Sequence, residues 1–207
     1  MADRLSLYNE ALRLIGEREL ANLSEQREPK RVLDTVWDDA LLYLLEQGFW
    51  NFATRTSQID SSPDVETSFG YQFAFDKPED WIRTVSLSAD QYFSFPLETY
   101  IDETGYWFSN IDPIYVRYIS DDEEYGLNIA GWPMTFAKTV AAYLAFEICE
   151  RLTQNRSNRT DLYQIYKARL KDARSKDAMN DPNKYLPPGS WTRSRMIGYT
   201  RSSRWDR

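Results

Sequence analysis

The sequence predicts an α+β protein: a four-helix bundle with an inserted small antiparallel β-sheet domain and an extended C-terminal arm. Apolar residues recur at helical spacing near both ends of the chain, and they alternate with period two between residues 71 and 120. Residues 183–207 combine prolines, arginines and isolated aromatics without a core-forming pattern. We therefore divide the chain into helical residues 1–48 and 130–182, an inserted β-domain at 49–129, and the arm at 183–207.

Two helices are predicted before the β-domain. The first spans residues 3–15 and ends at Gly16, the residue type that most often follows a helix C-terminus. The second begins at Pro29, which suits a first helical turn, and ends at Gly48. Its apolar pairs recur every four residues: Val32/Leu33, Val36/Trp37, Ala40/Leu41 and Leu44/Leu45. The short connection between the two helices predicts an antiparallel pair.

Four segments predict the strands of one small antiparallel sheet. Residues 71–75 and 114–120 read as single strands, and residues 100–108 read as a hairpin that turns at Gly105. Residues 81–88 read as a further strand whose Trp81, Arg83, Val85 and Leu87 share one face. The order of helices, sheet and helices is typical of an α+β chain.

Two more helices follow the β-domain. The first runs from Pro133 to about Thr153, and its alanines permit close packing, so we expect it to be the core helix. Its apolar stripe is Phe136, Val140, Tyr143/Leu144 and Ile148. The sole cysteine, Cys149, lies in this pattern and is predicted to be a small buried hydrophobe, not a nucleophile. The last helix is predicted to start near Thr160, a good N-cap.

Composition argues against an enzyme. The chain has no histidine, which removes the usual general base and the commonest metal ligand. No glycine-rich phosphate loop is present, and no cofactor is predicted. The acidic run 121–124 could bind calcium, but it lacks the alternating ligand spacing of an EF-hand loop, which favours a solvated turn. A hydrolase that uses carboxylates and a metal is therefore a weak third hypothesis.

Charge and apolar content limit the partners. The net charge is −7, divided between about +5 in residues 183–207 and −12 in the remainder. An acidic body disfavours generic nucleic-acid binding, which depends on Lys and Arg. The longest apolar stretch, residues 140–149, is too short to span a bilayer, and no signal peptide opens the chain, so we expect no membrane partner and synthesis in a cytoplasm.

The arm is the main candidate binding segment. Its large side chains are Trp191, Arg193, Arg195, Tyr199, Arg201 and Trp205. Arginines among aromatics suit DNA contact by phosphate binding and stacking, and they equally suit docking into a groove on a protein. A merely solubilising tail would not need three large aromatics. The acidic body favours the protein partner.

Several segments resemble the tail tubular protein A family, the head-to-tail adaptors of short-tailed phages. The resemblance lies in Leu7-Tyr-Asn-Glu-Ala-Leu12, Leu14-Ile-Gly-Glu17, Glu28-Pro-Lys-Arg-Val-Leu33, Val36-Trp-Asp-Asp39, Glu46-Gln-Gly-Phe-Trp-Asn-Phe-Ala53 and Trp191-Thr-Arg-Ser-Arg195. It is specific over residues 5–55 and looser over the sheet region. Related adaptors also occur in phages with long tails, so the tail type stays open.

The resemblance implies a structural virion protein of the phage tail. It implies a ring, usually of twelve copies, that joins the portal protein to the tail nozzle protein and lets the genome DNA pass through its lumen. The arm would then contact the portal. In such a ring, Phe49, Trp50 and Phe52 are candidates for the interface between subunits, with the alternative that they cap the helical core. The competing function is a DNA-binding accessory protein that uses the basic arm.

Overall fold

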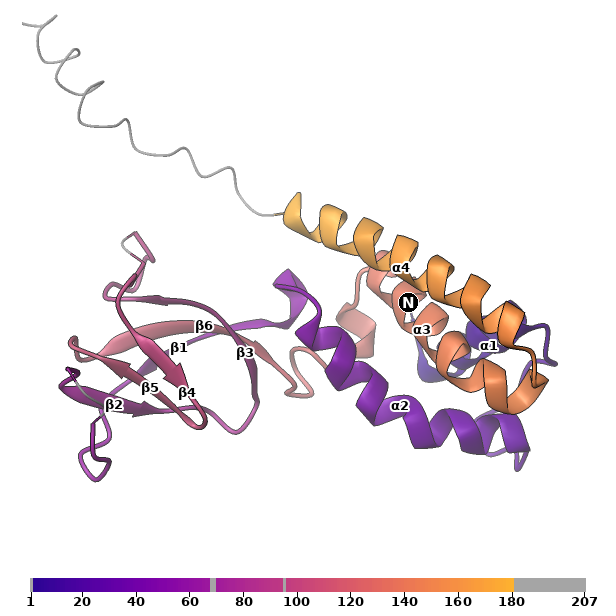
Figure 1. Cartoon of the computed structure of the whole chain (residues 1–207), viewed down its shortest axis with the longest axis horizontal. Helices are drawn as coiled ribbons and strands as arrows, with labels where there is room; N and C mark the ends of the chain where they lie inside the picture. The colour runs from indigo at the N-terminus through magenta and orange to yellow at the C-terminus, as the bar shows by residue number, and fades with distance from the viewer. Residues whose placement is uncertain (1, 68–69, 95, 181–207) are drawn as a thin grey trace, which may run out of the picture.

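The computed structural model describes residues 2–67, 70–94 and 96–180. This part of the chain is mixed α+β, as predicted, with four α-helices and two three-stranded antiparallel sheets. Figure 1 shows an elongated molecule with the sheets at one end and the helices at the other.

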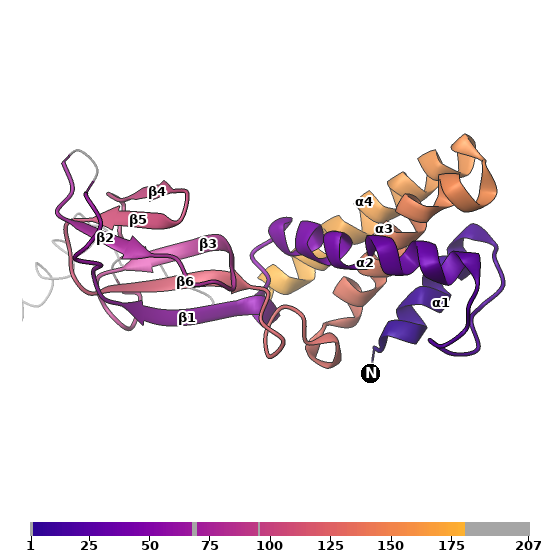
Figure 2. The same ribbon diagram turned by 90° about the horizontal axis from the view of Figure 1, so that it is seen from below.

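The helices are α1 (Arg4–Ile15), α2 (Glu28–Glu46), α3 (Met134–Thr153) and α4 (Arg156–Ala178). Helix α3 is the central helix, because α1, α2 and α4 all pack against it (Figure 2). Helix α1 contacts α2 through Tyr8 and Trp37 but packs more extensively on α3, and the predicted antiparallel direction of α1 and α2 stays a prediction.

The helix ends follow local side-chain chemistry. Asp3 caps α1 through a reciprocal pair of hydrogen bonds with Ser6, and Gly16 ends the helix at φ 81°, as predicted. Helix α4 starts at Arg156 and not at Thr160, because the Asn155 side chain accepts the first free amide protons. The Thr160 hydroxyl instead donates to a carbonyl one turn back in the same helix.

The core of the helical end is built on α3. The predicted stripe is confirmed, and its fully buried members are Phe136, Val140, Leu144 and Ile148. Cys149 has no exposed surface and packs in the same core, as the sequence predicts. Trp37 of α2 and Tyr8 of α1 are buried against each other, with ring centroids 5.3 Å apart.

The β-region forms two sheets and not one. One has the order β1 (Thr54–Ile59), β6 (Ile114–Ser120), β3 (Trp81–Ser88). The other has the order β2 (Phe73–Asp76), β5 (Tyr106–Ser109), β4 (Ile101–Glu103). Apolar side chains from both sheets bury one another in a second small core, formed by Phe75, Leu87, Trp107, Ile114, Val116 and Tyr118.

Two details of the sheets differ from the predicted pattern. Strand β1 was not predicted, because its sequence has a single apolar residue, Ile59; backbone pairing with β6 holds it at the sheet edge. Strand β3 has bulges at positions 82 and 85, so its four predicted face residues do not share one face. Val85 packs against the helical core, whereas Leu87 and Trp81 belong to the core between the sheets.

Candidate functional site

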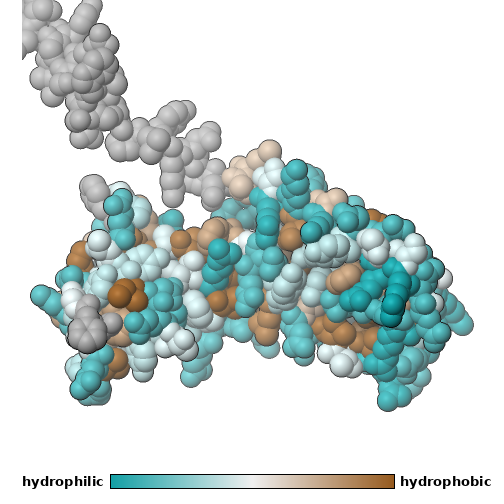
Figure 3. Space-filling model, in the orientation of Figure 1, coloured by the Kyte–Doolittle hydropathy of each residue, from teal (hydrophilic) through white to brown (hydrophobic). Residues whose placement is uncertain are grey.

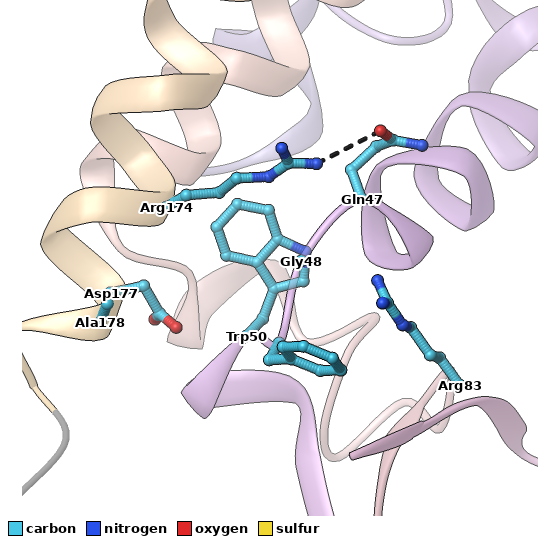
Figure 4. A pocket seen from close by; sticks show the side chains of 8 residues that line it. Gln47, Gly48, Trp50, Arg83, Arg174, Asp177 and Ala178 are labelled. Atoms are coloured by element: carbon cyan, nitrogen blue, oxygen red, sulfur yellow. Dashed lines mark hydrogen bonds between the residues drawn. The ribbon is translucent and has the colours of Figure 1, made fainter.

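A hollow lies where the helices meet the sheets, and we call it the junction groove. It has a volume of about 530 Å³ and lies between the end of α2, strand β3 and the last turns of α4 (Figure 4). Its lining residues are Gln47, Gly48, Phe49, Trp50, Arg83, Arg174, Asp177 and Ala178. Four of the eight lining residues belong to the segment 46–53.

Trp50 is a core residue of its own chain. Only 1% of its surface is exposed, its indole N–H donates to the Leu44 carbonyl at 2.9 Å, and its ring centroid lies 4.9 Å from that of Phe136. Phe52 is half-buried, with its ring centroid 4.7 Å from that of Phe136. For Trp50 the expectation of a subunit interface therefore gives way to the alternative of a core cap.

Phe49 is the member of this run that faces outward. It is 52% exposed, and the guanidinium of Arg83 lies 4.2 Å from its ring centroid. Arg83 also donates to the Glu46 carbonyl at 3.0 Å, so it spans from the sheet to the end of α2. An exposed aromatic held by a cation in this way is suited to contact a partner.

Polar contacts fix α4 against the junction. The Asn51 backbone N–H and side-chain amide both donate to Asp177, each at 2.9 Å. Arg174 donates to the Gln47 side-chain oxygen at 3.3 Å, as the dashed line in Figure 4 marks. The last turns of α4 are thereby tied to both the end of α2 and the short segment between α2 and β1.

Two exposed methionines extend the apolar surface beside the junction groove. Met134 at the start of α3 is 61% exposed and Met179 after α4 is 77% exposed. Both line a neighbouring hollow of about 400 Å³ that Trp50 also lines. Figure 3 shows apolar patches where the two ends of the molecule meet. Flexible methionines around a groove are typical of protein-binding surfaces.

The predicted arm residues Trp191, Arg193, Arg195, Tyr199, Arg201 and Trp205 lie outside the described residues. The described chain ends at Asn180, which lines the same hollow as Met179. The last described residue before the arm therefore lies beside the exposed apolar surface of the junction.

Asp80 organises the base of the sheet end. Its carboxylate accepts hydrogen bonds from Arg55, Tyr118 and Ser120. Burial disfavours the ionised carboxylate, but these hydrogen bonds outweigh burial and hold the pKa of Asp80 below its ordinary value. Burial raises the pKa of Tyr118 to about 12, and the neighbouring Asp80 carboxylate adds to the effect.

The acidic turn, residues 121–124, divides into an inner and an outer half. Asp122 accepts from the Glu124 backbone N–H at 2.8 Å and lies 3.8 Å from Arg55. Burial raises the pKa of Asp121. Glu123 and Glu124 are exposed. No group of three or more metal-ligating side chains is assembled within residues 2–67, 70–94 and 96–180.

Charge is divided between the two ends of the molecule. Residues 49–129 hold 4 basic and 15 acidic residues, a net of −11, whereas residues 1–48 and 130–182 hold 15 and 16, a net of −1. Helix α4 alone holds 7 basic and 3 acidic residues, a net of +4. The sequence showed a charge contrast between residues 1–182 and the arm, and a similar contrast is present within residues 1–182.

A second groove, between α2 and α4, was not predicted. This tyrosine groove has a volume of about 570 Å³. Its lining residues are Tyr43, Gln47, Tyr163, Tyr166, Lys167, Leu170, Lys171 and Arg174. The regular spacing of the α4 basic residues is visible in the sequence, but the tyrosines come from helices more than one hundred residues apart.

Comparison with protein families and with curated proteins finds no match to this chain. Among the described residues, none of the helices combines the length and apolar content needed to cross a membrane. The grooves around α4 combine apolar side chains, cations and tyrosines. Surfaces of this composition are suited to bind another macromolecule.

Proposed function

We propose that this chain is a structural virion protein, the adaptor subunit of a ring that joins a phage portal to the tail and forms part of the DNA ejection channel. The observation that carries the proposal is the segment 46–53. It carries the most extended family resemblance, it connects α2 to β1, and it presents Phe49 outward while Trp50 anchors it in the core. A ring interface needs such an exposed, anchored aromatic surface.

For the architecture, we propose a four-helix bundle that is interrupted by an inserted β-domain. The strands lie between α2 and α3 in the sequence, and each of the other three helices contacts α3. Side chains of the sheet such as Ile119 also pack against the helical core, so the β-domain would be held at a fixed position relative to the bundle.

The charge distribution supports a DNA conduit. A β-domain with a net charge of −11 repels the phosphate backbone, so a genome that passes the ring would not adhere to it. The sheet end would contact the nozzle protein, and the basic arm would contact the portal through Trp191, Arg193 and Arg195. The arm cations would then be buried in protein contacts, away from the channel.

The mass of the purified protein in solution, alone and mixed with its cognate portal rings, tests this function. The adaptor function predicts a large complex that carries many copies per portal ring, and loss of that complex when residues 183–207 are removed. A full-length chain that stays separate from portal rings under all conditions would contradict it.

The second function, a DNA-binding accessory protein, rests on the arginines and aromatics of the arm. It predicts retardation of DNA that weakens steeply as the salt concentration rises, because bound phosphates exchange with counterions. Removal of residues 183–207 should then abolish DNA retardation and leave any binding to portal rings unaffected.

A further inference from the structure

The tyrosine groove has the composition of a binding site for an anion. Lys167, Lys171 and Arg174 follow one another at intervals of four and three residues, which places them on one edge of α4. All three are exposed, and none forms an ion pair with a carboxylate in the part of the chain that the structure describes. Three adjacent cations on a body with net charge −12 are therefore available to a partner.

Aromatic rings form the floor and one wall of this groove. The Lys167 ammonium lies 4.6 Å from the Tyr163 ring centroid, and Tyr43 is 40% exposed at the α2 edge. Tyr43 stacks on Tyr143 with ring centroids 4.9 Å apart, and Tyr143 lies 5.0 Å from Tyr166. The rings support one another, so the groove has a firm apolar surface beside its cations.

Tyr166 places a buried hydroxyl beneath this groove. The residue is only 3% exposed and lines the groove, yet its hydroxyl makes no hydrogen bond of ordinary geometry within the described residues. Burial raises its pKa, and the nearby Tyr43 hydroxyl adds to the effect, so the group is a neutral donor.

The acidic turn lies on the far side of α2 from the groove. Tyr43 and Gln47 line the groove, whereas Leu45 projects about 160° away around the helix. On that opposite side, Leu45 contacts Gly126: a methyl carbon of Leu45 lies 3.1 Å from the position that a Cβ atom on Gly126 would take. Gly126 belongs to the same turn as the acidic run, since the Leu127 N–H donates to the Asp122 carbonyl at 3.2 Å.

We propose that the tyrosine groove of one subunit receives the acidic turn, with Glu123 and Glu124, of the next copy of this chain. The two surfaces are complementary in charge, and they are different patches of the molecule, as a head-to-tail contact requires. Glu123 and Glu124 are exposed and form no ion pair among the described residues, so they are free for this role. The inference rests on the proposed ring and names its interface.

Nucleic acid is the less suitable occupant. A nucleic-acid strand bound in the groove would also approach the sheet end, which carries a net charge of −11. The negative charge of the sheet end would repel the phosphates along the whole length of the nucleic acid. A short acidic segment places only a few negative charges, at the site of the three cations. The second copy supplies such a segment without any further component.

Cross-linking tests the contact independently of the portal. A chain with Lys171→Cys and Glu124→Cys should form a ladder of disulfide-linked multimers under mild oxidation, with or without portal rings, while the buried Cys149 stays unreacted. The matched control carries Arg156→Cys and Glu98→Cys, both on exposed residues outside the proposed contact, and should stay monomeric. No ladder from the first chain, or equal ladders from both, would overturn the proposal.

Charge reversal identifies the partners. Lys167→Glu with Lys171→Glu, or Glu123→Lys with Glu124→Lys, should lower the ring fraction about ten-fold or more, and all four changes in one chain should restore it. Each double variant should still attach to portal rings through its arm. Failure of the wild-type chain to bind portal would contradict the adaptor function, not this contact. A groove variant that keeps its rings but loses salt-dependent retention of single-stranded DNA would overturn the proposal in favour of nucleic acid.

Discussion

Asn51 donates two hydrogen bonds to Asp177, a residue 126 positions later, through its backbone N–H to the carboxylate and through its side-chain amide to the backbone carbonyl, both at 2.9 Å. The pair joins the first residues after α2 to the last turn of α4. These two hydrogen bonds therefore fix the direction in which the chain passes from α2 to β1.

Asn51→Ala should lower the free energy of unfolding by about 1 kcal/mol, because the side-chain hydrogen bond to the Asp177 carbonyl is lost. The last turn of α4 should also exchange its amide protons faster. Urea unfolding and hydrogen exchange measure the two effects. Asn158→Ala, an exposed position at the other end of α4, is the control, and equal losses in both variants would show that the contact contributes nothing.

Gly48→Ala should destabilise the protein by about 1–3 kcal/mol through overpacking. An added Cβ would lie 2.8 Å from the Trp50 indole, which is buried and hydrogen-bonded and cannot move aside. Gly131→Ala is the matched control, because its nearest neighbour would lie at an ordinary 3.7 Å. Thermal unfolding of the two variants measures the difference, and equal midpoints would contradict the packing described here.

Substitutions of Trp50 and Phe49 should have different effects: the first should lower stability, and the second should weaken assembly. Trp50→Ala should cost about 3–5 kcal/mol, since the residue is 1% exposed. Phe49→Ala should change stability by less than about 0.5 kcal/mol, yet reduce binding to neighbouring subunits or portal rings. Denaturant unfolding measures the free energy of unfolding of each variant, and sedimentation of mixtures with portal rings measures its assembly. A Phe49 variant that assembles normally would remove this residue from the interface.

The ionisation of Asp80 should make the free energy of unfolding decrease at acidic pH. Its folded pKa lies below the ordinary value of 3.8, so its stabilising effect is complete above that value and is lost as the pH falls through the folded pKa. Asp80→Asn should cost about 1–3 kcal/mol at pH 7. The gap between variant and wild type should narrow below about pH 4. Urea unfolding from pH 2.5 to 7 measures it, and parallel profiles would refute the assignment.

Much of the fold follows from local patterns in the sequence. The α3 stripe, the α1 end at Gly16 and the hairpin at Gly105 all depend on residues close together in the chain, and the structure confirms them. The start of α4 was wrong because Asn155 competes with Thr160 as a cap. Strand β1 was missed because pairing with β6, and not its own apolar pattern, makes it a strand.

The site was less predictable, because its contacts join distant segments. The run Phe49–Phe52 was found from its aromatic content, but which ring faces outward depends on where Phe136 of α3 lies. The tyrosine groove is lined by both α2 and α4, and no local pattern in the sequence predicts that these two helices line one groove. The two bulges of β3 likewise arise from pairing with β6, and they redirect Val85 toward the helices.

The burial of Cys149 makes the molecule a convenient substrate for site-specific labelling. The thiol is the sole one in the chain, has no exposed surface and lies 3.4 Å from the Thr153 hydroxyl inside the helical core. A maleimide dye would therefore leave the folded native chain unmodified and react only at a cysteine introduced on its surface. Energy transfer between two such dyes could then follow the approach of neighbouring subunits in real time, against no background from the native thiol.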